Sequence, residues 1–422
     1  MKIVIVGAGI CGLTAALSLH RAGFAPVVYE AVATMAPLGV GINVLPHAVR
    51  ELADLGLLPE LRALGVEIDE LVYLTRHGRP IWREPRGLAA GYAWPQVAVH
   101  RGEFQQMLLR QVQARLGPEA VIFGRLLIDL ETTDTGARAH FLDRVAGGPG
   151  EVVDADLLLA ADGIHSAVRR RFYPDEGAPK WNGVTLWRST SRSTGVLGGR
   201  SMLWAGHSRQ KFVAYPIAYD QATGETRLNW ICDLKAVEGE APTPPREDWN
   251  RPGRSADFLP RFDAWRWPGI DVPALVEASG DIFEFPMVDR DPLPRWTFGR
   301  TTLMGDAAHP MYPVGSNGAT QAIIDARAVA FHLATASDIA EALGRYEADR
   351  REATGRIVLM NRAHGPDRVM ELAHERAPNA DDDLDAVLPM AERQAIADGY
   401  KRAAGFDAAM MTAPSPYRLA GA

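Results

Sequence analysis

The sequence predicts an α/β protein in which a nucleotide-binding domain is interleaved with a mostly antiparallel β-sheet domain and followed by C-terminal helices. Three observations support this fold class. The chain begins with an apolar run, a glycine turn and an amphipathic stretch, which is the order strand, turn, helix. After about residue 174 the segments change to runs rich in Val, Tyr, Trp and Thr, which are typical of antiparallel strands. From about residue 301 the first pattern returns, with a buried strand and a long helix.

The first motif is the turn Gly7-Ala-Gly-Ile-Cys-Gly12, between a strand over 3–6 and a helix over 13–22. Gly7 permits the tight turn, Gly9 lets the backbone approach a pyrophosphate, and Gly12 lets the helix pack closely on the strand. The helix N-terminus offers free N–H groups and the positive end of its dipole to that phosphate. Glu30 ends the next strand, over 26–29, where it can accept hydrogen bonds from a ribose and repel a 2′-phosphate. The motif therefore predicts a Rossmann-type site for FAD or NAD rather than NADP.

The remaining elements follow from hydrophobic periodicity and turn residues. The sequence predicts helices over 47–55, 100–116, 319–333, 339–361 and 388–399, and strands over 73–81, 121–130, 137–142, 156–160, 185–190, 211–218, 227–234 and 301–304. Residues 237–260 are expected to be loop, and the tail beyond 411 to be disordered. The expected domains are a discontinuous nucleotide-binding domain (1–72, 97–175 and 280–365), a substrate-binding sheet domain (73–96 and 176–279), and a C-terminal helical segment with its tail (366–422).

Composition narrows the function classes. The chain has 422 residues, of which 47% are hydrophobic, and a formal net charge of -7 without a long basic run, which disfavours a nucleic-acid partner. We expect no membrane span and no secretory signal, because the apolar runs are short and interrupted. The two cysteines, Cys11 and Cys232, have neither metal-binding nor redox spacing. These features predict a cytoplasmic protein without a metal site.

Two further motifs each follow an apolar strand with an acid and a glycine. They are Asp162-Gly163 and Gly305-Asp306. Because ligands of open α/β sheets gather at the carboxyl ends of strands, Asp306 is placed to bind a ribityl or ribose hydroxyl. The loop from Gly315 to Ala319 opens a helix whose N–H groups can face an anion or a flavin. The alternative is that both aspartates only cap helices.

In this order along the chain, the three motifs resemble those of the group A flavoprotein aromatic hydroxylases, the para-hydroxybenzoate hydroxylase-like family, up to about residue 365. The resemblance implies that FAD is the bound cofactor and that Gly305-Asp306 contacts its ribityl chain. It links Asp162-Gly163, with Ser166 and Arg169, to both FAD and the nicotinamide. The cofactor-binding residues expected in all are Gly7, Gly9, Gly12, Glu30, Ala31, Asn43, Arg101, Asp162, Gly163, Gly305, Asp306, Gly315, Ser316, Asn317, Gly318 and Ala319.

Within that family the chain is most similar to the phenazine hydroxylases of the pyocyanin pathway. The likeness lies in Leu38-Gly-Val-Gly-Ile-Asn43, Trp82-Arg-Glu-Pro-Arg-Gly87, Ala214-Tyr-Pro-Ile217, Asn229-Trp230 and the run Pro286 to Pro294. It suggests a fused or nitrogen-containing aromatic substrate. The family chemistry implied is that NADH or NADPH binds transiently and reduces FAD, and that O2 then forms a C4a-hydroperoxide that hydroxylates the ring.

The flavin thus carries the chemistry, and no side chain is expected to act as a nucleophile. The resemblance places the backbone of Pro313 beside the flavin. Arg188 is suited to a substrate carboxylate, and Tyr215 to a phenol or ring nitrogen, although aromatic residues on strands are also typical of a core. His309 is expected to be structural. The substrate contacts expected in all are Trp187, Arg188, Tyr215, Met311 and Tyr312.

Several alternatives stay open at this point. An NAD-dependent dehydrogenase would use Gly7–Gly12 and Glu30 but would not need the other two motifs. The segment Trp265-Arg-Trp-Pro-Gly-Ile270 partly matches the sequence signature of flavin halogenases, although the match fails after the second Trp. An FAD-dependent oxidase or reductase, and an FAD-holding protein that sequesters an antibiotic, would share the FAD motifs. C-hydroxylation, decarboxylative hydroxylation and N-oxidation are equally compatible with the sequence, as are a monomer and a homodimer.

Overall fold

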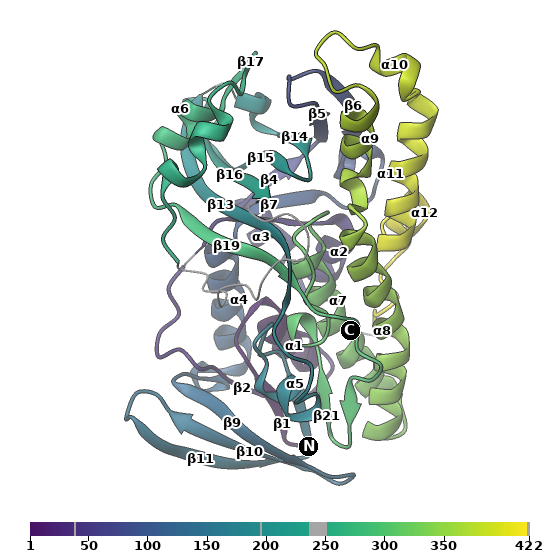
Figure 1. The fold of residues 1–422 in the computed structure, drawn as a ribbon. Coiled ribbons are helices and arrows are strands. Elements are labelled where there is room, and N and C mark those ends of the chain that lie inside the picture. Colours follow the sequence, from purple (N-terminus) through teal and green to yellow (C-terminus); the bar gives the residue numbers. More distant parts are fainter. Residues whose placement is uncertain (38, 195, 236–250, 420–422) are drawn as a thin grey trace.

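The computed structural model describes residues 1–37, 39–194, 196–235 and 251–419 (Figure 1). A six-stranded sheet forms the centre of the lower half in this view. Its strands are parallel except for the outermost, β20, which pairs antiparallel with β21. The order is β20 (Thr297–Phe298), β21 (Thr301–Leu303), β12 (Leu157–Ala160), β1 (Ile3–Val6), β2 (Val27–Tyr29) and β8 (Val121–Ile122). The parallel sheet and first helix predicted from the glycine motif are therefore confirmed.

Helices and a small sheet cover this central sheet. Helix α1 packs against α4 and α7, and α7 packs in turn against α8 and α2. A three-stranded sheet, at the bottom of Figure 1, contributes Phe141, which stacks on Tyr29 of β2 at 4.5 Å between ring centroids. The helices are α1 (Ile10–Arg21), α2 (Pro46–Asp54), α3 (Leu58–Leu64), α4 (Arg101–Leu116), α5 (Ala167–Phe172), α7 (Asn317–Thr335) and α8 (Ile339–Arg362), and the strands are β9 (Arg125–Thr132), β10 (Ala137–Asp143) and β11 (Gly148–Ala155).

The upper half is built on a seven-stranded sheet, antiparallel except where β14 pairs with β5. The order is β19 (Phe283–Asp289), β13 (Lys180–Thr194), β16 (Glu225–Lys235), β15 (Gln210–Tyr219), β14 (Ser201–His207), β5 (Glu70–Leu74) and β6 (Pro80–Pro85). A second three-stranded sheet consists of β3 (Gly41–Val44), β7 (Gln96–His100) and β4 (Val66–Ile68).

The two faces of the seven-stranded sheet have different neighbours. On one face Trp187, Phe212 and Trp230 form a core with Phe258 and Phe262. Strand residues of the other face pack on α9 and on β4 and β7, and at one end on the loop that contains Tyr312. Near the first face lie β17 (Arg266–Trp267), β18 (Ile270–Asp271) and α6 (Val272–Glu277), and short 3-10 helices occur at Gly87–Ala90, Pro118–Ala120, Val196–Gly199, Ser255–Asp257, Leu259–Phe262, Gly305–Ala307 and Gly365–Asp367.

Four C-terminal helices lie along one side of the molecule, in yellow and yellow-green in Figure 1. They are α9 (Arg368–Arg376), α10 (Leu384–Val387), α11 (Met390–Ala404) and α12 (Ala408–Thr412). The helix expected over 388–399 thus begins later and ends later. The expected disorder beyond residue 411 is wrong for Tyr417, which is 8% exposed and whose hydroxyl donates to Asp349 at 2.8 Å. Its Pro-Ser-Pro surroundings are typical of an unstructured tail, so local sequence gave no sign of this contact.

One expected domain boundary differs from the strand pairing. Residues 283–289 form β19, which pairs with β13, whereas the sequence assigned everything from 280 to 365 to the nucleotide-binding domain. The nearly continuous apolar run of this strand does not distinguish an antiparallel strand from a buried parallel one. The other domain boundaries stay predictions. Within the expected loop 237–260, residues up to 250 lie outside the described part, and the rest contains two 3-10 helices.

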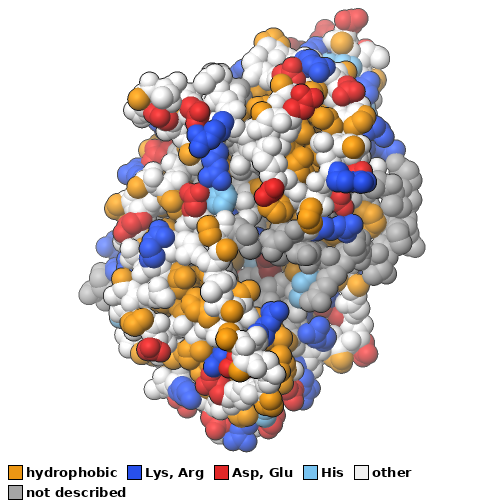
Figure 2. Space-filling model, turned by 90° about the vertical axis from the view of Figure 1, so that its left-hand side faces the viewer, with side chains coloured by type: hydrophobic (Ala, Val, Ile, Leu, Met, Phe, Trp, Pro, Cys, Tyr) orange, Lys and Arg blue, Asp and Glu red, His pale blue; other side chains and the backbone are white. Residues whose placement is uncertain are grey.

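On the face drawn in Figure 2, basic side chains are scattered among acidic and hydrophobic ones. In the Trp265–Ile270 segment, which approaches a halogenase signature, Trp265 and Ile270 belong to the hydrophobic core and Trp267 packs against it. Trp265 is 5% exposed and contacts the ring of Phe262 at 4.9 Å between centroids. This position agrees with packing as the reason for the two tryptophans.

Candidate cofactor and substrate site

Two glycines of the first motif are required by close packing, and the third leaves the backbone accessible to a ligand. A Cβ atom on Gly7 would lie 2.4 Å from the carbonyl oxygen of Ala161, and one on Gly12 would lie 1.9 Å from that of Gly7. A Cβ on Gly9 would meet nothing within 4 Å. Gly9 also precedes α1 without a side-chain cap or an acidic residue in the first turn. The N-terminus of α1 is therefore open to an anion, as a pyrophosphate requires.

The side chain of Glu30 is hydrogen-bonded to the glycine loop of the first motif. Its carboxylate accepts hydrogen bonds from the backbone N–H groups of Ala8 at 2.7 Å and Val32 at 2.9 Å. A carboxylate has about four acceptor positions, so capacity for ribose hydroxyls remains. Ala31 is half-buried beside it.

Asp162 combines the two interpretations that the sequence left open. Its Oδ2 accepts from the backbone N–H of Ala167 at 2.8 Å and of Val168 at 3.4 Å, so it caps the start of α5. Its Oδ1 is buried and has no hydrogen-bond partner among the described residues. Burial raises the pKa of this carboxyl. An unfilled buried acceptor at the end of β12 fits a hydroxyl donor from FAD.

Asp306 lies just beyond the carboxyl end of β21. Burial among surrounding protein atoms raises the pKa of its carboxyl, while the positive charges of His309 and Arg101 oppose that rise. Its side chain nevertheless remains solvent-exposed. An exposed carboxylate at the carboxyl end of a parallel strand is accessible to a ribityl hydroxyl.

Asp325 of α7, which the sequence analysis did not single out, fixes the loop that carries Asp306. Its Oδ2 accepts from the backbone N–H of Gly305 at 2.9 Å and lies 2.6 Å from Nε2 of His309. Its Oδ1 accepts from Nε of Arg350 at 2.8 Å. Burial alone would raise the pKa of Asp325, but His309 and Arg350 hold it below the usual value. His309 is therefore part of this scaffold, as expected. A single acid within the apolar run of α7 was the available signal.

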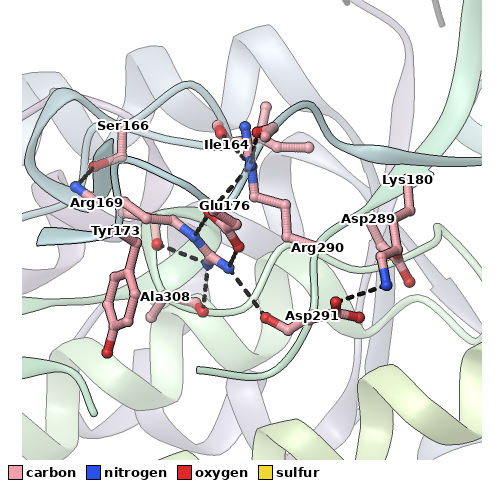
Figure 3. A network of polar contacts seen from close by, with 12 residues as sticks. Ile164, Ser166, Arg169, Tyr173, Glu176, Lys180, Asp289, Arg290, Asp291 and Ala308 are labelled. Carbon is pink, nitrogen blue, oxygen red and sulfur yellow. Dashed lines mark hydrogen bonds and ion pairs between the residues drawn. The ribbon is translucent and has the colours of Figure 1, made fainter. Parts of the chain in front are cut away.

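Arg169 joins the second motif to the third (Figure 3). Its guanidinium donates to the carbonyl oxygens of Ala307 at 3.1 Å and Ala308 at 2.8 Å, and to that of Asp291 at 3.0 Å. Glu176 pairs with both Arg169 and Arg290. The guanidinium of Arg169 is thus engaged within the protein, and its position supports a structural role rather than direct contact with FAD or the nicotinamide. Beside this network lies a polar cavity of about 130 Å³, lined by Ile164, His165, Ser166, Arg169, Arg170, Tyr173, Pro174, Glu176, Gly177 and Arg290.

The loop before α7 is held by Tyr400, another residue that the sequence analysis did not single out. Gly315 and Ser316 both have left-handed backbones, with φ of 73° and 61°. A Cβ on Gly315 would lie 2.0 Å from the hydroxyl of Tyr400. That hydroxyl accepts from the Asn317 side chain at 2.8 Å and donates to that of Asn361 at 3.1 Å. The side chain of Asn317 is therefore used within the protein, whereas the half-buried Ser316 makes no side-chain hydrogen bond to the start of α7.

Gly318 and Ala319 lie in the first turn of α7, where both are half-buried. Pro313 is exposed and directly follows Met311 and Tyr312, which are both buried. Met311 packs with a cluster that contains Leu45 and Phe406, and Tyr312 packs with a different cluster on the seven-stranded sheet.

Arg188 and Tyr215 meet at a backbone group. Both donate to the carbonyl oxygen of Gly41, Arg188 through Nη2 at 2.6 Å and Tyr215 through its hydroxyl at 2.7 Å. Asn229 accepts from the N–H of the same glycine at 2.7 Å. The two side chains predicted to bind substrate thus fix β3. The side chain of Asn43, a predicted cofactor contact on that strand, is buried and accepts from Gln96 at 3.2 Å.

The position of Trp187 does not support its predicted contact with substrate. Its ring stacks on Phe258 at 5.1 Å between centroids, and its Nε1 donates to Glu284 at 3.1 Å. Its neighbour Leu186 packs with Tyr312 on the opposite face of the sheet. Because side chains alternate along a strand, Trp187 faces away from the loop that was expected to lie at the flavin.

The described residues contain no group of three or more His, Cys, Asp and Glu residues placed to hold a metal ion. No described helix is long and apolar enough to cross a membrane.

Comparison with known proteins identifies the family of this chain. Residues 1–251 and 269–360 match the family described as FAD binding domain. The chain is 48% identical to a phenazine 1,6-dicarboxylic acid hydroxylase of Lysobacter antibioticus, over 85% of this chain and 89% of that protein. It is 31% identical to an aurachin C monooxygenase/isomerase of Stigmatella aurantiaca, over 85% and 87%. Among solved structures, Klebsiella pneumoniae HpxO with FAD and uric acid aligns at a TM-score of 0.73 and 25% identity, over 97% of this chain and 96% of that one. The chain therefore belongs to the FAD-binding family of flavin-dependent aromatic hydroxylases, with FAD as cofactor and NAD(P)H and O2 as co-substrates.

Proposed function

We propose that this enzyme hydroxylates an aromatic carboxylic acid of the phenazine type. The observation that carries the proposal is the 48% identity to the phenazine diacid hydroxylase, spread over most of both chains. The identity to the aurachin C enzyme is 31% over a similar length, so the phenazine relative is the better guide to the substrate.

The residues present fit FAD. Bound FAD accepts electrons from NAD(P)H and activates O2 for transfer of one oxygen atom. The open N-terminus of α1 at Gly9 suits the pyrophosphate, and the unfilled Oδ1 of Asp162 and the exposed carboxylate of Asp306 suit hydroxyl groups. Tyr400 and Asp325 hold the two loops that would bracket the cofactor.

The polar cavity beside Arg169 supports the predicted link between the second motif and the nicotinamide cofactor. Its lining includes Arg170, whose charge suits a phosphate of NAD(P)H, and Arg290, which pairs with Glu176. A cytoplasmic location, and a monomeric or homodimeric state, remain predictions of the sequence.

The test is oxygen transfer from labelled O2. The purified holoenzyme is mixed with NADH or NADPH, ¹⁸O2 and phenazine 1,6-dicarboxylate. We expect the diacid to stimulate consumption of NAD(P)H, and mass spectrometry of the product to show one ¹⁸O atom. Retention or loss of a carboxyl group in the product separates simple from decarboxylative hydroxylation. Stoichiometric hydrogen peroxide with unchanged diacid would contradict the proposal and favour an oxidase.

A further inference from the structure

A small cavity lies where the seven-stranded sheet, the strand β7, the loop before α7 and the C-terminal helices meet. Its volume is about 10 Å³, room for about one water molecule or one oxygen-sized group. It is separate from the polar cavity beside Arg169, with which it shares no lining residue. It is lined by Leu45, Leu71, Arg86, Gln96, Met202, Trp204, Gly315, Ser316, Pro366, Tyr400 and Phe406.

Three polar atoms of this lining have unfilled hydrogen-bonding capacity. Nε of Arg86, Nε1 of Trp204 and Oε1 of Gln96 are buried and have no hydrogen-bond partner among the described residues. The three residues are 8%, 6% and 2% exposed. They come from three separate segments of the chain. Since a buried polar group without a partner is destabilising, three of them beside one cavity indicate a partner that enters from outside.

The charges around the cavity favour an anion. Nη2 of Arg86 donates to Glu84 at 3.0 Å, and Glu84 also pairs with Lys401, so one carboxylate serves two cations. Among the lining residues, all of which are described, Arg86 carries a charge and none is acidic. The nearby acids Asp233 and Asp367 pair with Lys211 instead.

Two N–H donors that line one cavity, one of them part of a cationic guanidinium, select an acceptor, and a carboxylate oxygen is the strongest acceptor that an organic acid offers. We propose that this cavity receives one oxygen of the carboxylate of the aromatic acid, with Arg86 and Trp204 as its donors. Oε1 of Gln96 then accepts from a hydroxyl or N–H next to that carboxylate. The inference rests on the proposed function and assigns the carboxylate to Arg86 rather than to Arg188, which does not line this cavity and whose Nη2 is bonded to Gly41.

The position of the cavity also places the rest of the substrate. An aromatic ring is too large for it, so the ring must lie outside. Gly315 and Ser316 form part of the wall, which puts a ring attached to the anchored carboxylate next to the loop expected to hold the flavin.

The test measures binding to the holoenzyme through the change in flavin absorbance, with phenazine 1,6-dicarboxylate and unsubstituted phenazine as probes. We expect the wild type to bind the diacid more tightly than phenazine. Trp204→Phe removes the indole N–H but keeps an aromatic ring, and Arg86→Met removes the guanidinium. Each should weaken diacid binding about tenfold or more, the value of one charge-assisted hydrogen bond, with little change for phenazine. Trp82→Phe is the matched control: its Nε1 is also unpartnered among the described residues, but it does not line the cavity.

The outcomes separate this inference from the proposed function. If the diacid binds in a manner that depends on Arg86 and Trp204 but gains no oxygen, the carboxylate site stands and the proposed hydroxylation falls. If the diacid is hydroxylated and its affinity is the same in both variants as in the wild type, the function stands and the carboxylate site is wrong. Equal affinity of the wild type for the diacid and phenazine, or equal losses for both probes in the variants, also overturns the inference.

Discussion

At the scale of single residues, we expect FAD retention to depend on Asp306. Its side chain is exposed just beyond the carboxyl end of β21, where it can accept hydrogen bonds from a ribityl hydroxyl. Asp306→Ala should weaken FAD binding about 10- to 100-fold, the value of one or two hydrogen bonds to a charged group. The ratio of flavin to protein absorbance after purification measures this. The exposed Asp129, changed to Ala, is the control, and a fully yellow Asp306→Ala protein would remove Asp306 from the site.

Asp325 should affect stability as well as the cofactor. Asp325→Asn keeps the size of the side chain but leaves His309 and Arg350 without their buried counter-charge. Breaking a buried ion pair in this way costs about 3–5 kcal/mol of unfolding free energy. Urea unfolding of the variant measures the loss, with Asp349→Asn as the control at a more exposed ion pair of the neighbouring helix. A loss below about 1 kcal/mol would mean that the ion pairs of Asp325 contribute little to the stability of the fold.

The residues that sequence reasoning found and missed differ in kind. Gly7, Gly9, Gly12 and the acids after β12 and β21 were predicted because their roles follow from local turn geometry. Asp325 and Tyr400 were missed because their partners come from other segments of the chain. Residue type alone also led Arg188 and Tyr215 to be assigned to substrate, since nothing in the sequence indicates that a backbone carbonyl would take their hydrogen bonds.

At the scale of elements, the docking of α9 on β14 should depend on pH. His207 of β14 and His374 of α9 stack with their centroids 3.7 Å apart. Burial, followed by the charges of His374, Arg76 and Arg209, lowers the pKa of His207 to about 4. The pKa of His374 is lowered as well, mainly by burial, although Glu371 and Glu375 oppose the shift. An unfolded histidine titrates near 6.5, so protons bind the unfolded state preferentially between these values. The stabilisation is therefore complete above about pH 6.5 and is lost as the pH falls toward 4.

Urea unfolding at pH 7.5 and pH 5.0 measures this effect. From the titration of His207 alone, the free energy of unfolding should fall by about 2 kcal/mol between the two values. Other buried groups contribute, including His47, whose pKa burial lowers to about 3. The relevant quantity is therefore the difference in pH dependence between the wild type and His207→Phe. An identical pH dependence in both proteins would contradict the assignment to this pair.

The strands were predictable to different degrees. β1, β12 and β21 were recognised because continuous apolar runs bounded by glycine and acid are typical of buried parallel strands. β3, β4 and β7 were not identified as a separate sheet, because their pairing joins segments on either side of α2 and α3 and has no local signal.

At the scale of the whole molecule, helix α11 is bonded to segments around the candidate site. Nη1 of Arg393 in α11 donates to the carbonyl of Ile81 at 2.8 Å, Lys401 pairs with Glu84, and Tyr400 binds the loop before α7. The family resemblance ends near residue 365, and the family match ends at residue 360, so neither assigns a role to this segment.

Tyr400→Phe tests whether the loop before α7 depends on α11, because it removes only the hydroxyl group of Tyr400. The ring stays in place against Gly315, but Asn317 and Asn361 lose their shared hydroxyl. The loss of two neutral hydrogen bonds should lower the free energy of unfolding by about 1–3 kcal/mol and, because the loop is no longer fixed to α11, weaken FAD binding several-fold. Thermal unfolding and an FAD titration of the apoprotein measure the two effects, with Tyr219→Phe at an exposed tyrosine as the control. A variant that is less stable yet binds FAD as tightly as the wild type would show that α11 supports the fold without shaping the cofactor loop, and the C-terminal helices would then be structural alone.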